Sequence, residues 1–194
     1  MPGPVIEALM LEDKMLIWKF NHGDREAFCR IYQKYLDDLL TLAVSLLGDA
    51  HAAQDVVQDV FIRFGESNGG FQLRGSLKSY LAVCVANQAR DIYRSAKRHQ
   101  TVGLNEAQHI ASAAADPVGW AISNEQQQRI SRALAEIPYD QREVIILHLH
   151  GDMKFREIAR TQQTSIKTVQ SRYRYGLDKL RSLLNSEVCN ATIG

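Results

Sequence analysis

The helix expected over residues 165–181 carries the side chains best suited to binding chemistry in this chain. Residues 160–181 hold six Lys or Arg side chains and one acidic side chain, Asp178, the local charge excess of a phosphate-binding face. In a major groove, Arg and Lys pair with guanine and Gln pairs with adenine. The pattern favours DNA binding; the alternative is a helical hairpin with a solvated basic face. The side chains expected to point outward are Lys167, Gln170, Ser171, Arg174 and Tyr175.

A second basic stripe lies on the helix expected over residues 77–97. Arg90, Arg94 and Arg98 recur every four residues, so they share one side of a helix, with Lys97 beside them. Cations interleaved with aromatic rings suit a single strand, because the cations hold the backbone and the rings stack on unpaired bases. The alternative is a solvated basic helix. The nearby polar and aromatic side chains are Tyr80, Asn87, Asp91 and Tyr93.

The helix expected over residues 49–64 is acidic. Residues 49–66 hold four carboxylates against Arg63, and Asp55 and Asp59 stand one turn apart. We do not expect Asp55 and Asp59 to be a catalytic carboxylate pair, because a catalytic site needs several further groups that converge on one point. A solvated acidic face and a docking face for a basic partner both remain open.

Composition limits the classes of protein that this chain can represent. It has 194 residues, a net charge of +1 and 45% hydrophobic residues, as in ordinary globular proteins. Cys29, Cys84 and Cys189 are far apart, so neither a disulfide framework nor a metal site is expected. We find no signal peptide, and no apolar run approaches the roughly 20 residues that span a bilayer. We therefore expect a cytoplasmic protein without membrane insertion, cofactor or metal.

Apolar periodicity predicts an all-α chain of two small helical domains joined by a linker. Helices are expected over residues 12–20, 25–47, 49–64, 77–97 and 130–137, after a loose lead-in over residues 1–10. A short helix over residues 155–160, a tight turn and a longer helix capped by Ser165 form a helix-turn-helix. The inward stripe of the last helix is Val169, Tyr173, Gly176 and Leu180.

The C-terminal segments resemble region four of bacterial RNA polymerase sigma factors, and more narrowly the extracytoplasmic-function (ECF) group. The resemblance rests on residues 133–138, 141–144, 157–159 and 168–172, with Gly151 between them. It implies that this module binds the −35 promoter element as duplex DNA. The family usually has a small apolar residue and a Gly where this chain has Gln162 and Gln163. The implied −35 contacts are Lys167, Thr168, Gln170, Ser171, Arg172, Arg174 and Tyr175.

The N-terminal segments resemble region two of the same group, on residues 23–28, 53–61, 79–81 and 87–94. The resemblance implies docking on the coiled coil of the largest subunit of core polymerase through Asp55, Gln58, Asp59 and Phe61. It also implies capture of the melted −10 strand by the helix that follows and the loop before it. The implied −10 contacts are Tyr80, Asn87, Arg90, Asp91, Tyr93 and Arg94.

These resemblances predict a sigma factor that directs core polymerase to promoters, helps to open the −10 region, and has no active site of its own. The expected domains are residues 1–98 and 129–186, joined by a linker over residues 99–128 and followed by a frayed tail over 187–194. An anti-sigma factor is an expected partner. The alternatives are a stand-alone helix-turn-helix regulator and a sigma mimic that sequesters an anti-sigma factor.

Overall fold

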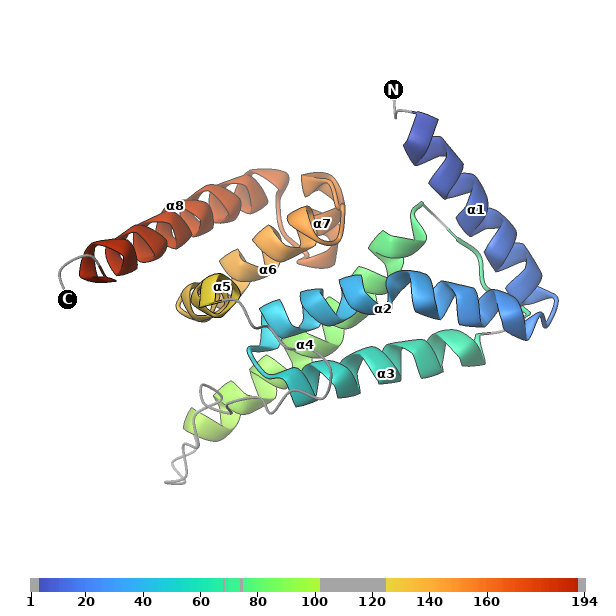
Figure 1. The fold of residues 1–194 in the computed structure, drawn as a ribbon, viewed down its shortest axis with the longest axis horizontal. Coiled ribbons are helices and arrows are strands. Elements are labelled where there is room, and N and C mark those ends of the chain that lie inside the picture. Colours follow the sequence, from blue (N-terminus) through green and yellow to red (C-terminus); the bar gives the residue numbers. More distant parts are fainter. Residues whose placement is uncertain (1–3, 68, 74, 102–124, 192–194) are drawn as a thin grey trace.

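The described residues of this computed structural model are 4–67, 69–73, 75–101 and 125–191, and they form eight helices and no strand (Figure 1). The predicted all-α fold is therefore confirmed. The helices are α1 (Pro4–Asn21), α2 (Arg25–Leu47), α3 (Ala50–Glu66), α4 (Leu77–Thr101), α5 (Glu125–Ala135), α6 (Tyr139–Leu149), α7 (Phe155–Thr161) and α8 (Ile166–Ala191).

The N-terminal half is a four-helix arrangement in which α2 packs against α1, α3 and α4. The helix boundaries follow local chemistry. The Asp24 carboxylate accepts hydrogen bonds from the backbone N–H groups of Glu26 and Ala27, at 2.9 and 3.3 Å, and so caps α2. Gly48 ends α2 with φ 73°, a left-handed conformation that glycine adopts without steric cost. The predicted limits of α2 are confirmed.

Four helix ends differ from the sequence prediction by more than two residues. Helix α1 begins at Pro4, α4 extends to Thr101, α5 begins at Glu125 and α8 continues to Ala191. These extensions contain no interior Pro or Gly, and Pro4 stands at a first helical position, where proline is tolerated. The loose lead-in and frayed tail were therefore predicted too long. Most of the expected linker, residues 102–124, lies outside the described residues.

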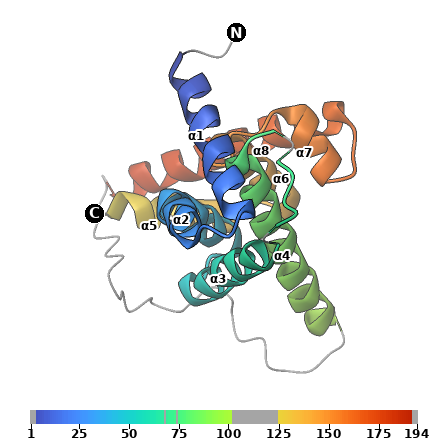
Figure 2. The ribbon, with the colours of Figure 1, turned by 90° about the vertical axis from the view of Figure 1, so that its right-hand side faces the viewer.

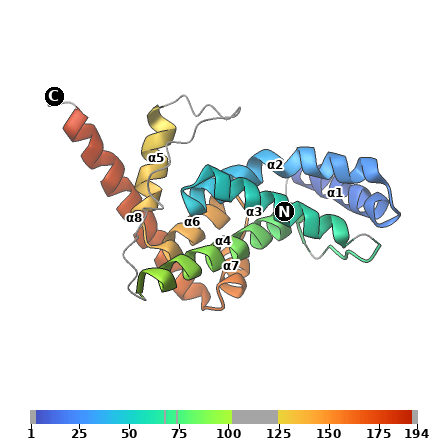
Figure 3. The ribbon, with the colours of Figure 1, turned by 90° about the horizontal axis from the view of Figure 1, so that it is seen from below.

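The C-terminal half is built on α8, which packs against α5, α6 and α7. Seen from below, α5 and α8 diverge like the arms of a V (Figure 3). The Ser165 hydroxyl accepts a hydrogen bond from the Thr168 backbone N–H at 3.0 Å, which confirms the predicted cap. Val169 is fully buried and Gly176 is also buried, so the inward stripe of α8 lies where the periodicity predicted. Helices α7 and α8 form the predicted helix-turn-helix.

The two halves pack against each other. Helix α2 contacts α5 and α6, α4 contacts α6, and the buried apolar residues form one cluster that continues from α1 into α8. Two views related by a quarter turn both show α6 beside α4 (Figures 1 and 2). The sequence alone gave no indication of this packing.

A buried carboxylate fixes α1 on α2. Asp13 is 5% exposed, and it accepts a hydrogen bond from the Tyr35 hydroxyl at 2.6 Å and another from the Lys34 ammonium at 2.8 Å. Burial raises the pKa of the Tyr35 hydroxyl, and the bond to Asp13 raises it further. Tyr35 therefore stays a neutral donor to the Asp13 carboxylate.

Replacing Asp13→Ala should lower the free energy of unfolding by about 2 kcal/mol, because it leaves the buried Tyr35 hydroxyl without an acceptor. Denaturant titration followed by circular dichroism measures this loss. Asp37→Ala, which removes an exposed carboxylate from α2, is the matched control and should change stability by less than about 0.5 kcal/mol. Equal effects of the two substitutions would contradict the assignment.

Candidate nucleic-acid interface

The outer face of α8 presents exposed basic, amide and aromatic side chains. Lys167, Gln170, Arg174 and Tyr175 are exposed on the side opposite the buried Val169. The Arg174 guanidinium lies 4.9 Å from the centre of the Tyr175 ring and donates a 3.3 Å hydrogen bond to its hydroxyl. Because α8 is held by three other helices, this face is rigid and free of overlying chain among the described residues.

The other three predicted −35 residues turn partly inward. The Arg172 guanidinium donates to the side-chain amide oxygen of Gln162 at 2.7 Å and to the Asp140 carboxylate at 2.8 Å. The Thr168 hydroxyl shares a 2.8 Å hydrogen bond with the Ser165 hydroxyl, and Ser171 is half-buried. Arg172 therefore anchors α8 to α6 and to the preceding turn, whereas the four exposed residues form the outer face.

The turn between α7 and α8 contains two glutamines, Gln162 and Gln163. Gln163 adopts φ 51°, the left-handed conformation that a glycine would favour. The Gln162 amide donates to the Glu143 carboxylate at 2.6 Å and to the Asp140 carbonyl at 3.2 Å. Gln162 thus forms a polar bridge between α6 and α8.

Replacing Gln163→Gly should raise the free energy of unfolding by about 0.5–1 kcal/mol, because relief of the left-handed strain exceeds the added backbone entropy. Thermal and denaturant unfolding measure the change. In contrast, Lys179→Gly in the exposed interior of α8 should lower stability by about 1 kcal/mol. A destabilised Gln163→Gly variant would show that the side chain, rather than the backbone, matters at this turn.

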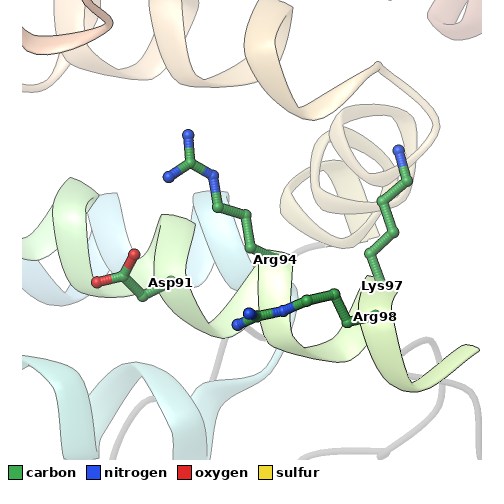
Figure 4. Close-up of a pocket in the computed structure, with 4 residues that line it drawn as sticks. All are labelled: Asp91, Arg94, Lys97 and Arg98. Carbon is green, nitrogen blue, oxygen red and sulfur yellow. The ribbon is translucent and has the colours of Figure 1, made fainter.

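Helix α4 carries the second predicted nucleic-acid surface. Tyr80, Asn87, Asp91 and Arg94 are exposed along it. Toward its C-terminal end, a cavity of ≈ 560 Å³ is lined by Asp91, Arg94, Lys97 and Arg98, with Arg94 and Lys97 extending from the same side of the helix (Figure 4). Three cations around one hollow make this end of α4 suited to an anionic chain.

Helix α6 covers part of this α4 surface. Arg90 donates a 2.8 Å hydrogen bond to Glu143, whose side chain is only 1% exposed. The Tyr93 ring stacks on the Tyr139 ring, with centroids 4.4 Å apart and planes 16° from parallel. Burial raises the pKa of the Glu143 carboxyl, while Arg90 and Gln162 act in the opposite direction. Sequence reasoning missed Tyr139 and Glu143, because no local pattern pairs them with α4.

The acidic face of α3 is open. Asp55, Gln58 and Asp59 are exposed, and the 52% exposed Ile62 lies one turn beyond them on the same side. Phe61 is 3% exposed and packs against the Tyr32 ring at 4.7 Å between centroids, so it supports the helix from inside. The face combines carboxylates with one apolar side chain, which suits a basic partner that also buries apolar surface.

The described residues form neither a metal-binding cluster nor a membrane-spanning helix. Within them, no three His, Cys, Asp or Glu side chains converge closely enough to hold a metal ion. None of the helices described is both long and apolar enough to cross a membrane.

Two family models match this chain. Residues 31–99 match "Sigma-70 region 2", and residues 127–180 match "Sigma-70, region 4". The first match covers most of α2 to α4, and the second covers α5 to α7 and the larger part of α8. The two matches thus contain the three surfaces described above.

Individual relatives agree with the family models. The chain is 26% identical over 179 residues to the ECF RNA polymerase sigma factor SigW of Bacillus subtilis (strain 168), covering 88% of this chain and 96% of SigW. It is 29% identical over 170 residues to SigX of the same organism, covering 84% and 88%. Among solved structures, the sigma factor RpoE of Bartonella quintana, crystallised with the anti-sigma factor NepR, superimposes with a TM-score of 0.62 at 25% identity, covering 81% of this chain and 96% of RpoE.

Proposed function

This chain belongs to the ECF group of the sigma-70 family, and on that premise we propose which of its surfaces carries out each step of promoter recognition. As a sigma factor it directs core RNA polymerase to promoters for transcription initiation. One observation supports assigning each step to its own helix: three chemically distinct faces lie on three helices. The face of α3 is acidic, that of α4 is basic and aromatic, and that of α8 is basic with amides.

The α3 face docks on core polymerase. Asp55, Gln58 and Asp59 are its polar contacts, and Phe61 holds the helix in place from the core. Their exposure and local negative charge support a basic partner surface, since complementary charge steers encounter and fixes orientation. We assign this surface to the coiled coil of the polymerase's largest subunit.

The α8 face binds the −35 element as duplex DNA. Lys167, Gln170, Arg174 and Tyr175 make the contacts to bases and backbone, because they are exposed together on one face of a helix that can enter the major groove. Thr168, Ser171 and Arg172 lie at the edge of this face. Arg172 contributes mainly by positioning α8 through Gln162 and Asp140.

The α4 face captures the melted −10 strand. Arg90 and Arg94 hold the backbone, and Tyr80 and Tyr93 offer ring faces to unstacked bases. Asn87 and Asp91 supply hydrogen-bonding groups beside them, and both are exposed.

Residues 1–98 and 129–186 act as two domains, and residues 99–128 act as the linker between them.

The remaining assignments follow from the family. The protein has no catalytic activity of its own and works in the cytoplasm, where core polymerase and promoters are found. A solved relative with the same fold was crystallised with an anti-sigma factor. We extend that kind of partner to this chain.

Run-off transcription with bacterial core polymerase, on genomic fragments that include the chain's own upstream region, tests the function. Specific transcripts should appear only when the protein is added. Asp59→Lys should reduce them at least about tenfold and weaken co-elution with core polymerase, because like charges then meet at the docking face. Asp37→Lys on α2 is the charge-matched control. Failure of the unaltered protein both to yield transcripts and to co-elute would refute the function.

Replacing Arg174→Ala should weaken promoter binding by the holoenzyme by about 1–3 kcal/mol, the usual contribution of a good base contact. The loss should depend on the −35 sequence, so scrambling that element should remove the difference between the two proteins. Electrophoretic mobility shifts on a promoter from the run-off experiment measure it. Unchanged affinity would remove Arg174 from the −35 contacts.

A further inference from the structure

The C-terminal end of α1 lies beside the connection between α3 and α4 (Figure 1). Asn21, the last residue of α1, uses both ends of its side-chain amide on Phe71 of that connection. Its Nδ2 donates to the Phe71 carbonyl oxygen at 2.8 Å, and its Oδ1 accepts from the Phe71 backbone N–H at 3.2 Å. Two opposite hydrogen bonds fix both the position and the orientation of a residue, as in an antiparallel strand pair. Phe71 is therefore clamped to α1.

The clamp matters because this connection has few other contacts that fix its backbone. Gly69 and Gly75 stand on either side of Phe71, with φ 90° and 103°. Glycine leaves the backbone conformationally free, so ordering such a segment costs more entropy than ordering other segments. Among the described residues 69–73, the only hydrogen bonds that reach a helix are the two with Asn21.

The Phe71 ring in turn contacts the Tyr80 ring on α4. Their centroids lie 4.9 Å apart and their planes 63° apart, an edge-to-face contact. Phe71 also meets the buried Phe64 ring at 5.1 Å and 81°, and Phe64 stacks on Phe20 of α1 at 4.8 Å. A row of rings thus runs from the core to the surface of α4. It holds the Tyr80 ring, which is 39% exposed, at a fixed tilt.

We propose that Asn21 is a positioning residue for capture of the melted −10 strand, and that it acts on Tyr80 through Phe71. The inference rests on the proposed role of Tyr80, which offers its ring to an unstacked base. A ring that is already held at one tilt does not have to be ordered when the base binds, so stacking on it is stronger. Asn21 itself makes no contact with DNA, and it lies before the residues that match region 2, 31–99.

Binding of two DNA probes by the holoenzyme separates positioning from loss of fold. Both probes come from a promoter found by run-off transcription. The first is a fork, with the −35 element as duplex and the non-template −10 strand single, and the second is the −35 duplex alone. Asn21→Ala should lower affinity for the fork about tenfold and leave affinity for the duplex unchanged, because the clamp acts only on the α4 surface. Fluorescence anisotropy measures both affinities, and a variant that merely unfolds more easily would lose both alike.

Two further variants divide the clamp into its parts. Asn21→Asp keeps the shape of the side chain and the acceptor for the Phe71 N–H, but it removes the donor to the Phe71 carbonyl oxygen. Phe71→Leu keeps the backbone clamp and removes the ring edge that meets Tyr80. Both should weaken fork binding, in the same direction as Asn21→Ala. Gln33→Ala, which removes an exposed amide from α2, is the control and should change neither affinity, and circular dichroism melting curves verify that all variants are folded.

A double-variant cycle decides whether Asn21 acts through Tyr80. Tyr80→Ala alone should weaken fork binding at least as much as Asn21→Ala, since it removes the ring itself. Adding Asn21→Ala to Tyr80→Ala should then cause no further loss, because no ring remains to be positioned. An undiminished effect of Asn21→Ala in the Tyr80→Ala background would overturn the inference. Unchanged fork binding by Asn21→Ala alone would overturn it as well.

The outcomes separate this inference from the proposed function. If Tyr80→Ala leaves fork binding unchanged, the proposed −10 role of Tyr80 is wrong, and the inference is wrong with it. If Tyr80→Ala weakens fork binding and Asn21→Ala does not, only the inference is wrong. Run-off transcription with the unaltered protein reports the sigma activity by itself in either case.

Discussion

The buried carboxylate of Glu143 is the contact through which the two halves of this protein depend on each other. A charge with 1% exposure is costly unless it is paired, and Arg90 from the first half and Gln162 from the second both bond to it. The Glu143 side chain therefore links α6 both to α4 and to the turn before α8. The surfaces on α4 and α8 are therefore joined through one set of hydrogen bonds.

Three rigid helices keep three kinds of chemistry apart. Each helix has an apolar stripe that fixes its rotation: Phe61 on α3, Leu81 on α4 and Val169 on α8 are all buried. The polar face on the opposite side of each helix is therefore presented at a fixed angle. The net charge of +1 hides this segregation, because the acidic face of α3 and acidic residues elsewhere in the chain together offset the basic faces of α4 and α8. Charge distribution, rather than total charge, carries the functional information.

Much of the fold could be predicted from the sequence, because its determinants are local. The caps Asp24 and Ser165 act within three residues of themselves, and the stripe of α8 repeats within single turns. Helix ends were the weakest predictions, since Pro4–Asn21 and Ile166–Ala191 extend through segments that lack any stop signal. At the candidate sites, the exposure of Asp55, Asp59 and Arg174 followed from helical spacing, whereas the inward turn of Arg172 did not.

The sequence by itself determined the helices, their buried faces, the segregation of charge and the resemblance to the sigma family, because each of these depends on residues a few positions apart. Only the tertiary structure decided that Arg90 pairs with Glu143, that the Tyr93 ring stacks on Tyr139 and that Gln162 bridges α6 and α8. Arg90 and Glu143 are 53 residues apart in the chain. A contact over that separation depends on how whole helices pack, so no spacing rule along the chain could have revealed it.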